Sequence, residues 1–194
     1  MESSRPPLLL ASGSTYKRDL FGRLGLEFLA QSAPIEELRL PEEPPLEMAI
    51  RLAREKALAS RSDHPDAFII GADQVIALGD QIFQKPGQRQ QAIAQLLELQ
   101  GQTHILITAV ALSTPCKALL EAQVTFEMEM RPLSPTEIAA YVDQDTPFDC
   151  AGSYKIEAAG IRLFRNARGP DPSAIEGLPL TRVWALLEDG GYFS

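Results

Sequence analysis

Short apolar runs and amphipathic segments alternate along this chain. The run at 8–11 is continuous and is followed by small polar residues, a pattern typical of a buried first strand. The same reasoning predicts further strands at 28–31, 67–72, 75–78, 105–112, 124–130 and 161–164. Helical spacing and helix-start signals predict helices from about 14 to 24 and at 46–60, 88–99, 134–142 and 179–187.

Two of these elements have sharper local signals. Ser134 and Glu137 form a capping-box pattern with Pro135 at the first helical position, which favours a helix start there. Gly79 and Asp80 indicate a hairpin turn between two strands. Because strands and helices alternate and no linker interrupts them, we expect an α/β fold with a mixed, twisted sheet and flanking helices. Residues 1–194 are expected to form a single domain with two lobes around a central cleft.

Composition and charge limit the kinds of ligand that the protein surface can bind. The chain has 194 residues, is 45% hydrophobic and 23% charged, and has a formal net charge of −8. Such a surface repels nucleic acid and anionic lipid, so a polyanionic ligand must bind in a local basic pocket. The N-terminus lacks a secretory signal, and the apolar runs are too short to span a bilayer. We therefore expect a cytoplasmic protein with free Cys116 and Cys150, although a disulfide between them is the alternative.

The segment 12–18 is a candidate anion site. A Ser/Gly turn that leads into a helix exposes backbone N–H groups and the positive end of the helix dipole. Lys17 and Arg18 fall in the first helical turn, where each cation costs about 0.3–1 kcal/mol unless an anion is bound. The alternative is a capped surface helix with two solvated cations. No Walker A or GxGxxG pattern is present.

Asp73 is the second candidate. It follows a strongly apolar run and precedes Gln74, so we expect it where a strand passes into a turn. Ligands of α/β proteins gather at strand ends, and a carboxylate there can deprotonate water or bind a magnesium ion. The alternative is a turn aspartate that bonds to its own backbone.

Further candidates are weak when taken singly. Glu36 and Glu37 lie in an acidic, proline-rich loop, and Lys56 and Lys85 are isolated cations. Each is most simply a solvated surface charge, but together they suit a magnesium-bound triphosphate. His64 and His104 have no zinc-binding spacing, no GxSxG elbow is present, and aromatic residues are not interleaved with basic ones.

Seven motifs resemble those of the Maf family in sequence order. Residues 10–18 are similar to the opening Ser-x-Ser-x-x-Arg-Arg motif, and 33–37 to the Val-Asp-Glu loop. The remaining similar segments are 51–57, 71–75, 85–86, 150–157 and 177–180. The resemblance covers nearly the whole chain and implies an inosine-triphosphatase-like fold. It also implies hydrolysis of a nucleoside triphosphate to the monophosphate and pyrophosphate with a divalent cation, magnesium or manganese, and a homodimer.

The resemblance also implies a role for each matching residue. Asp73 would activate water, and Glu37 would be a second carboxylate for the cation. Arg18, Lys56 and Lys85 would bind phosphates, with hydrogen bonds from Ser12 and Ser14. Lys17 departs from the family's first arginine and lacks bidentate geometry for phosphate.

The subgroup is indicated by Gln74 and by Glu157. Members that act on dTTP or UTP have Asp-Thr where this chain has Asp73-Gln74, so the chain looks like the 7-methyl-GTP subgroup. Glu157 can accept hydrogen bonds from a methylated guanine, and Tyr16 can stack on its cationic ring. The alternatives are a pyrophosphatase for dTTP, UTP or another modified nucleotide, and a nucleotide-binding regulator of cell division without turnover.

Overall fold

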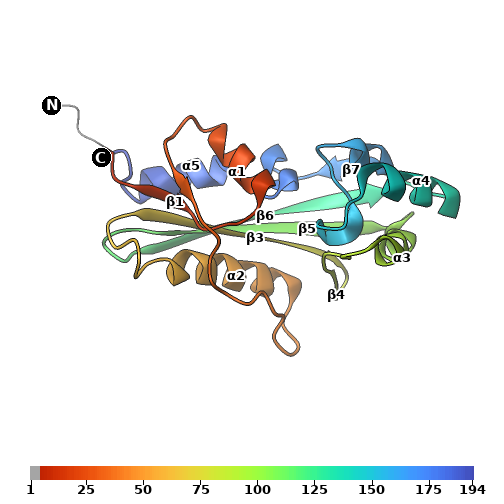
Figure 1. Ribbon diagram of the computed structural model, residues 1–194, viewed down its shortest axis with the longest axis horizontal. Helices are drawn as coiled ribbons and strands as arrows, with labels where there is room; N and C mark the ends of the chain where they lie inside the picture. The colour runs from red at the N-terminus through yellow and green to blue at the C-terminus, as the bar shows by residue number, and fades with distance from the viewer. Residues whose placement is uncertain (1–4) are drawn as a thin grey trace. The chain divides into compact units, whose positions relative to one another are not determined.

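A computed structural model describes residues 5–194 and confirms the α/β class (Figure 1). Its strands form a seven-stranded mixed sheet in the order β2-β1-β3-β5-β6-β7, with β4 paired to β3. In chain order the elements are β1 (Leu8–Leu10), α1 (Thr15–Gly22), β2 (Leu29–Ala30), α2 (Pro45–Ala59), β3 (Phe68–Leu78), β4 (Gln81–Phe83), α3 (Arg89–Leu99), β5 (Thr103–Ser113), β6 (Leu119–Met130), α4 (Pro135–Asp145), η1 (Ala151–Ser153), η2 (Ala159–Leu163), β7 (Phe164–Arg168), η3 (Pro172–Glu176) and α5 (Leu180–Asp189).

The chain divides into two compact units whose segments interleave. Unit 1 consists of the chain up to Gln74, Thr108–Val124 and Asp171–Ser194. Unit 2 consists of Val75–Ile107 and Thr125–Pro170. Because the boundaries fall inside β3, β5 and β6, each of these strands contributes residues to both units.

Unit 1 has helices on both faces of its part of the sheet. β1 is parallel to β2 and β3, with Leu10 in register with Ile70. Successive residues of a strand point to opposite faces, and both faces are covered here: α2 lies on one side, and α1 and α5 lie on the other (Figure 1). Leu8 and Leu10 join the core that includes Phe21 of α1, whereas Leu9 packs in a second cluster. Two-sided burial explains why the first strand is a continuous apolar run.

Unit 2 combines antiparallel strand pairs with two helices. β4 pairs with β3 and β7 pairs with β6, both in the antiparallel sense. Gly79, in the turn between β3 and β4, has a φ of 59°, which suits the predicted hairpin. The capping box at the start of α4 is also confirmed, because Ser134 and Glu137 bond to each other's backbone N–H groups.

Two sequence predictions need correction. β3 runs without interruption through Asp73 and Gln74, so Asp73 lies in the middle of a strand and not at its end. We expect a turn there from the sequence because two polar residues follow a strongly apolar run, but in the structure the Lys56 ammonium offsets the cost of keeping the Asp73 carboxylate inside the strand. The strand expected at 161–164 lies instead at Phe164–Arg168, after the short helix η2. The four residues from Ile161 to Phe164, one of them Arg162, are too few to distinguish helix from strand by their pattern.

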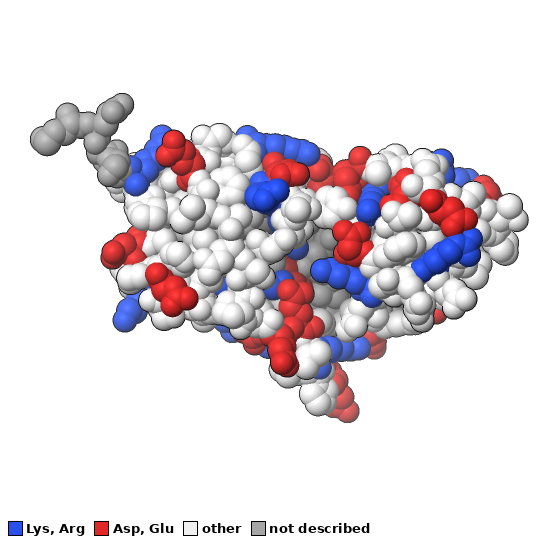
Figure 2. Space-filling view, viewed as in Figure 1, with Lys and Arg blue, Asp and Glu red and all other residues white. Residues whose placement is uncertain are grey.

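The described residues contain no helix that is long and apolar enough to cross a membrane. Cys116 and Cys150 are both free, as expected. On the face that Figure 2 shows, lysine and arginine side chains are interspersed with aspartate and glutamate side chains.

Candidate active site

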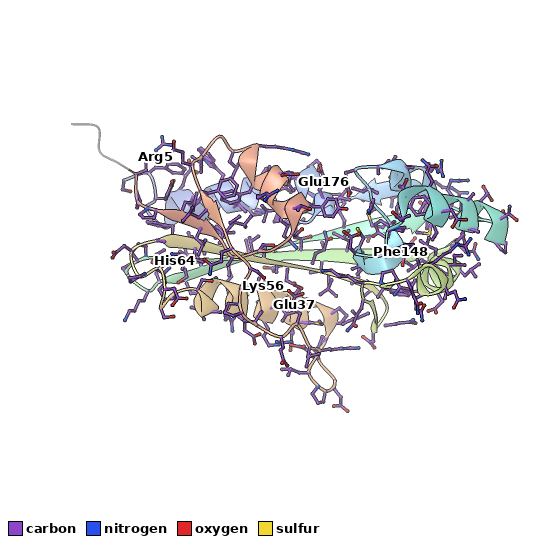
Figure 3. All side chains as sticks on the ribbon, in the orientation of Figure 1. Arg5, Glu37, Lys56, His64, Phe148 and Glu176 are labelled. Carbon is purple, nitrogen blue, oxygen red and sulfur yellow. The ribbon has the colours of Figure 1, made fainter. Side chains whose placement is uncertain are left out.

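Lys56 joins two carboxylates in unit 1. Its Nζ lies 2.6 Å from Oδ1 of Asp73 and 2.7 Å from Oε1 of Glu37. Lys56 and Asp73 are buried, with residue exposures of 7% and 6%, whereas the Glu37 side chain is 51% exposed. Figure 3 shows Glu37 and Lys56 next to each other. Three side chains that the sequence proposed separately therefore form one charged cluster that is open to solvent on its Glu37 side.

Close packing of α2 on β3 brings Lys56 to Asp73. Gly71 and Asp73 are two residues apart and therefore face the same side of β3. A Cβ atom at Gly71 would lie 2.1 Å from the carbonyl oxygen of Ala53 and 2.5 Å from the amide nitrogen of Ala57, both in α2. Only glycine allows the helix backbone to approach so closely, and this approach buries the Lys56 side chain against the strand.

The cluster shifts the ionisation of its members. Burial favours the neutral amine of Lys56, but the charges of Asp73 and Glu37 outweigh this effect and raise its pKa above the ordinary value. Burial also raises the pKa of Asp73, and the ammonium groups of Lys56 and Lys17 oppose this shift. An ionised carboxylate with a raised pKa is a better proton acceptor than an ordinary aspartate.

The start of α1 supplies cations and a cap. The Ser14 side chain caps the helix by accepting a hydrogen bond from the Lys17 amide, and the Ser12 hydroxyl accepts one from the Ser14 amide. Lys17 is close enough for its charge to oppose the rise that burial causes in the pKa of Asp73. Tyr16 is half-buried, whereas Arg18 is exposed with its Nε 3.8 Å from Oδ1 of Asp19.

Gln74 is held by hydrogen bonds within unit 1. Its Nε2 donates to the Thr108 hydroxyl at 3.1 Å and to the Ala174 carbonyl at 2.9 Å. A Cβ atom at Gly177 would lie 3.8 Å from Oε1 of Gln74 and 3.6 Å from Cε of Lys17, so both side chains border this glycine. The structure therefore brings Lys17 and Gln74 to the start of the segment that leads into α5.

Sequence reasoning missed the residue that fixes this segment. Asp171 is 2% exposed and accepts hydrogen bonds from the hydroxyl and amide groups of Ser173 and Thr181. These bonds tie η3 to the first turn of α5. An aspartate followed by proline at the first helical position is a helix-start signal that could have indicated this role.

Two predicted site residues, Lys85 and Glu157, belong to unit 2. Both are exposed. The segment that precedes Glu157 is fixed by three bonds: Ser153 Oγ donates to Gln95, the Tyr154 hydroxyl bonds to His104, and the Lys155 amide donates to the Tyr141 hydroxyl. Ser153 has a φ of 63°, a left-handed conformation that is uncommon for a non-glycine residue.

The Asp73 and Glu37 carboxylates of unit 1 suit a magnesium or manganese ion that completes its coordination with water or substrate oxygens. The described residues contain no group of three or more His, Cys, Asp or Glu side chains that could hold a metal. Asp73 and Glu37 nevertheless direct carboxylate oxygens at one cation, the Lys56 ammonium. Magnesium commonly takes one or two carboxylates and completes its shell with water and substrate phosphates.

Comparison with known proteins agrees with this architecture. Relatives named 7-methyl-GTP pyrophosphatase include one from Pseudomonas putida, 43% identical over 95% of this chain and 97% of that protein, and one from Alcanivorax borkumensis, 43% identical over 98% of each. The Ham1 protein of Staphylococcus aureus shares the fold, with a TM-score of 0.52, 14% identity and coverage of 94% of this chain and 98% of that one. Residues 7–190 match the model of the Maf-like proteins, and the chain therefore belongs to the Maf family.

Proposed function

We propose that this protein is a nucleoside triphosphate pyrophosphatase that converts 7-methyl-GTP and water into 7-methyl-GMP and pyrophosphate. The observation that carries the proposal is the contact of buried Lys56 with Asp73 and Glu37. The cluster pairs a proton acceptor of raised pKa with the Lys56 cation, and Lys17 and Arg18 at the start of α1 add positive charge that suits a polyphosphate. Relatives of 43% identity over nearly the whole chain have the corresponding name, which supports the same activity here.

Asp73 acts as the general base in this proposal. Its carboxylate takes a proton from water while the water oxygen bonds to a phosphorus atom of the α–β bridge. The bridging P–O bond breaks, its electron pair stays on the leaving phosphate oxygen, and the nucleoside monophosphate and pyrophosphate are released. Lys56 is fixed beside Asp73 and offsets negative charge there, while Lys17 and Arg18 at the start of α1 bind phosphate oxygens together with Ser12 and Ser14.

Asp73 and Glu37 would hold the divalent cation. When bound, magnesium or manganese neutralises charge on the phosphate oxygens and polarises the phosphorus atom. Glu37 is exposed enough to exchange its contact with Lys56 for a cation that arrives with the substrate. Lys85 in unit 2 is assigned to phosphate binding by the family resemblance.

The family resemblance assigns recognition of the base to Glu157 and, separately, to Tyr16. Methylation gives the guanine ring a positive charge, and its Watson–Crick edge presents N–H donors. The Glu157 carboxylate accepts these donors with charge assistance, and the half-buried Tyr16 ring stacks on the cationic base. Gln74, through Thr108 and the η3 backbone, keeps the adjoining segment of unit 1 in place.

A nucleotide panel tests the activity. Purified protein with magnesium or manganese should release pyrophosphate and the monophosphate fastest from 7-methyl-GTP, with GTP, dTTP and UTP as comparisons. A preference for dTTP or UTP would replace the proposed substrate while keeping the reaction. Failure to release pyrophosphate from any nucleotide, under conditions in which a relative is active, would contradict the enzyme and favour a binding regulator of cell division.

Glu157→Gln tests base recognition separately. The amide keeps the shape of the side chain but loses the charge, so kcat/KM for 7-methyl-GTP should fall about tenfold or more. The value for GTP should change much less, because neutral guanine gains less from the carboxylate. An unchanged ranking of nucleotides would remove Glu157 from the recognition site.

Cellular location and assembly also belong to the proposal. The two free thiols fit the reducing cytoplasm. A homodimer and the absence of nucleic-acid binding stay predictions, which light scattering and a mobility-shift assay would check.

A further inference from the structure

Glu37 lies in a loop that has no regular structure to fix it. The loop joins β2 to α2, and in Figure 1 it extends away from the sheet beside the start of α2. Acidic side chains gather on it in Figure 2. A carboxylate in such a loop keeps a defined position only if the backbone beside it is held, so the contacts of the next residues are informative.

Arg51 of α2 holds the backbone immediately after Glu37. One nitrogen, Nη2, donates to the Leu38 carbonyl at 2.9 Å and to Oε2 of Glu43 at 2.8 Å. Its Nε donates to Oε1 of Glu43 at 2.6 Å, and Nη1 donates to both oxygens of Glu55 at 3.1 Å. All three guanidinium nitrogens are therefore engaged, and the planar fork connects the loop to its own helix.

Glu43 completes the connection from the loop side. Its carboxylate is buried, with 6% side-chain exposure, and also accepts a hydrogen bond from the Leu40 amide at 3.0 Å. Its backbone carbonyl accepts two bonds from Arg39, at 2.9 and 2.8 Å. Arg51, Glu43 and Arg39 thus fix the loop at Leu38, Leu40 and Glu43 itself.

The same helix supplies the cation that Glu37 contacts. Lys56 follows Arg51 in α2 by five residues, and Arg51 binds the carbonyl of the residue next to Glu37. The distance between the Glu37 backbone and the Lys56–Asp73 pair therefore depends on this arginine. The Lys56–Glu37 ion pair is half exposed on its Glu37 side, and an ion pair of this kind contributes little against the entropy of a loop.

We propose that Arg51, with Glu43 as its buried partner, is a positioning residue that sets Glu37 beside Asp73 for a divalent cation. This inference rests on the proposed function for the identity of the cation. Loss of the Arg51 guanidinium group leaves Asp73 and Lys56 in place but allows Glu37 to move away from them. The magnesium concentration needed for half-maximal activity should then change more than kcat at saturating magnesium.

Arg51→Lys keeps the charge and removes the fork. The half-saturating magnesium concentration should rise about tenfold or more, as expected when a supporting partner of a metal ligand is lost. In contrast, kcat at saturating magnesium should change only a few-fold. Arg54→Lys is the matched control: Arg54 lies on the same helix and makes a two-bond pair with Glu121, but it does not touch the loop. The inference would be overturned if the half-saturating magnesium concentration rose equally in both variants, or did not rise in Arg51→Lys.

Two further readouts do not depend on turnover. Hydrogen exchange of the Leu40 amide should accelerate in Arg51→Lys and in Glu43→Gln, but not in Arg54→Lys. Manganese binding in the presence of a non-cleavable α,β-methylene triphosphate, measured by calorimetry, should weaken in the same two variants. Glu43→Gln serves if Arg51→Lys fails to fold, and unchanged exchange and binding would contradict the positioning role.

A double-mutant cycle separates this inference from the proposed function. In a Glu37→Gln background, Arg51→Lys should have little further effect on the magnesium requirement, because both changes act on one carboxylate. Additive effects would show that Arg51 acts elsewhere. If the wild-type protein hydrolyses no nucleotide, the proposed function fails, whereas the exchange of the Leu40 amide still decides whether Arg51 holds the loop.

Discussion

Asp73 combines a buried position with a cationic partner, and this combination determines what its replacement should do. Asp73→Asn keeps the side-chain shape but cannot take a proton from water. We expect kcat to fall by about 10²-fold or more, the range for loss of a general base. Nucleotide affinity, measured by calorimetry with a non-cleavable analogue, should fall far less. Retained turnover would remove Asp73 as the base and favour a different water-activating group.

His104 is a buried histidine in unit 2 with 1% exposure. Its Nε2 bonds to the Tyr154 hydroxyl at 3.1 Å, and within the described residues Nδ1 has no hydrogen-bond partner. Burial therefore lowers the pKa of His104 to about 4 from an ordinary value of 6.5. Between these values the unfolded chain binds a proton that the folded chain does not, so stability falls as the pH is lowered from 6.5 to 4.

His104→Gln should remove this dependence. The free energy of unfolding of the wild type should drop by up to about 3 kcal/mol more than that of the variant over the same pH range. His64→Gln is the control, because His64 is only partly buried. Urea denaturation at pH 7, 5.5 and 4 measures the difference. Parallel pH profiles for wild type and His104→Gln would show that His104 is protonated in the fold.

At the scale of elements, the approach of α2 to β3 depends on Gly71. A Cβ atom there would overlap backbone atoms of Ala53 and Ala57, and backbone cannot move aside as a flexible side chain can. Gly71→Ala should therefore destabilise the fold by about 1–3 kcal/mol, the range for overpacking, and should also reduce activity by displacing Lys56. Gly22→Ala is the control, since nothing lies within 4 Å of the added atom. Chemical denaturation of both variants checks this, and equal stabilities would refute the close-packing role.

The elements themselves were largely predictable, because local periodicity and caps encode them. The predicted helices and most predicted strands agree with the structure to within a few residues at most boundaries, whereas the segments 67–72 and 75–78 are one strand and 161–164 is not where the last strand lies. The strand predictions failed where a contact with a residue distant in sequence overrode the local pattern. The change from apolar to polar residues at Asp73 predicts the end of a strand, yet β3 continues through Asp73, whose carboxylate accepts a hydrogen bond from Lys56. β6 begins at Leu119, before the alternating stretch from Val124, because strand pairing extends past the amphipathic signal.

For the whole molecule, we expect one cooperative unfolding transition. β3, β5 and β6 each contribute residues to both units, so one unit cannot lose its strands without disturbing those of the other. Thermal unfolding followed by fluorescence of Trp184, the single tryptophan and a residue of unit 1, should coincide with that followed by far-ultraviolet circular dichroism. Two separate midpoints would show that the units unfold independently.

The sequence by itself determined the order of the elements and the residue types available for chemistry. Periods of 2 and 3.6 residues, caps and turns act over a few positions, so a linear pattern is enough to predict them. The family motifs likewise identified Asp73, Lys56 and Glu37 as a set. None of these signals gives a distance between residues that are far apart in sequence.

Only the tertiary structure decided which charges meet. Asp73 and Lys56 are separated by 17 positions, and their 2.6 Å contact exists because Gly71 lets α2 lie on β3. No sequence pattern predicts the hydrogen bonds of Arg51 to Leu38 and Glu43. They form because a side chain of α2 reaches the backbone of the loop that precedes this helix. The burial of the Asp73 carboxylate and the Lys56 ammonium that offsets its cost exist only in the folded chain. Folding thereby brings charges that are far apart in sequence together in a candidate active site.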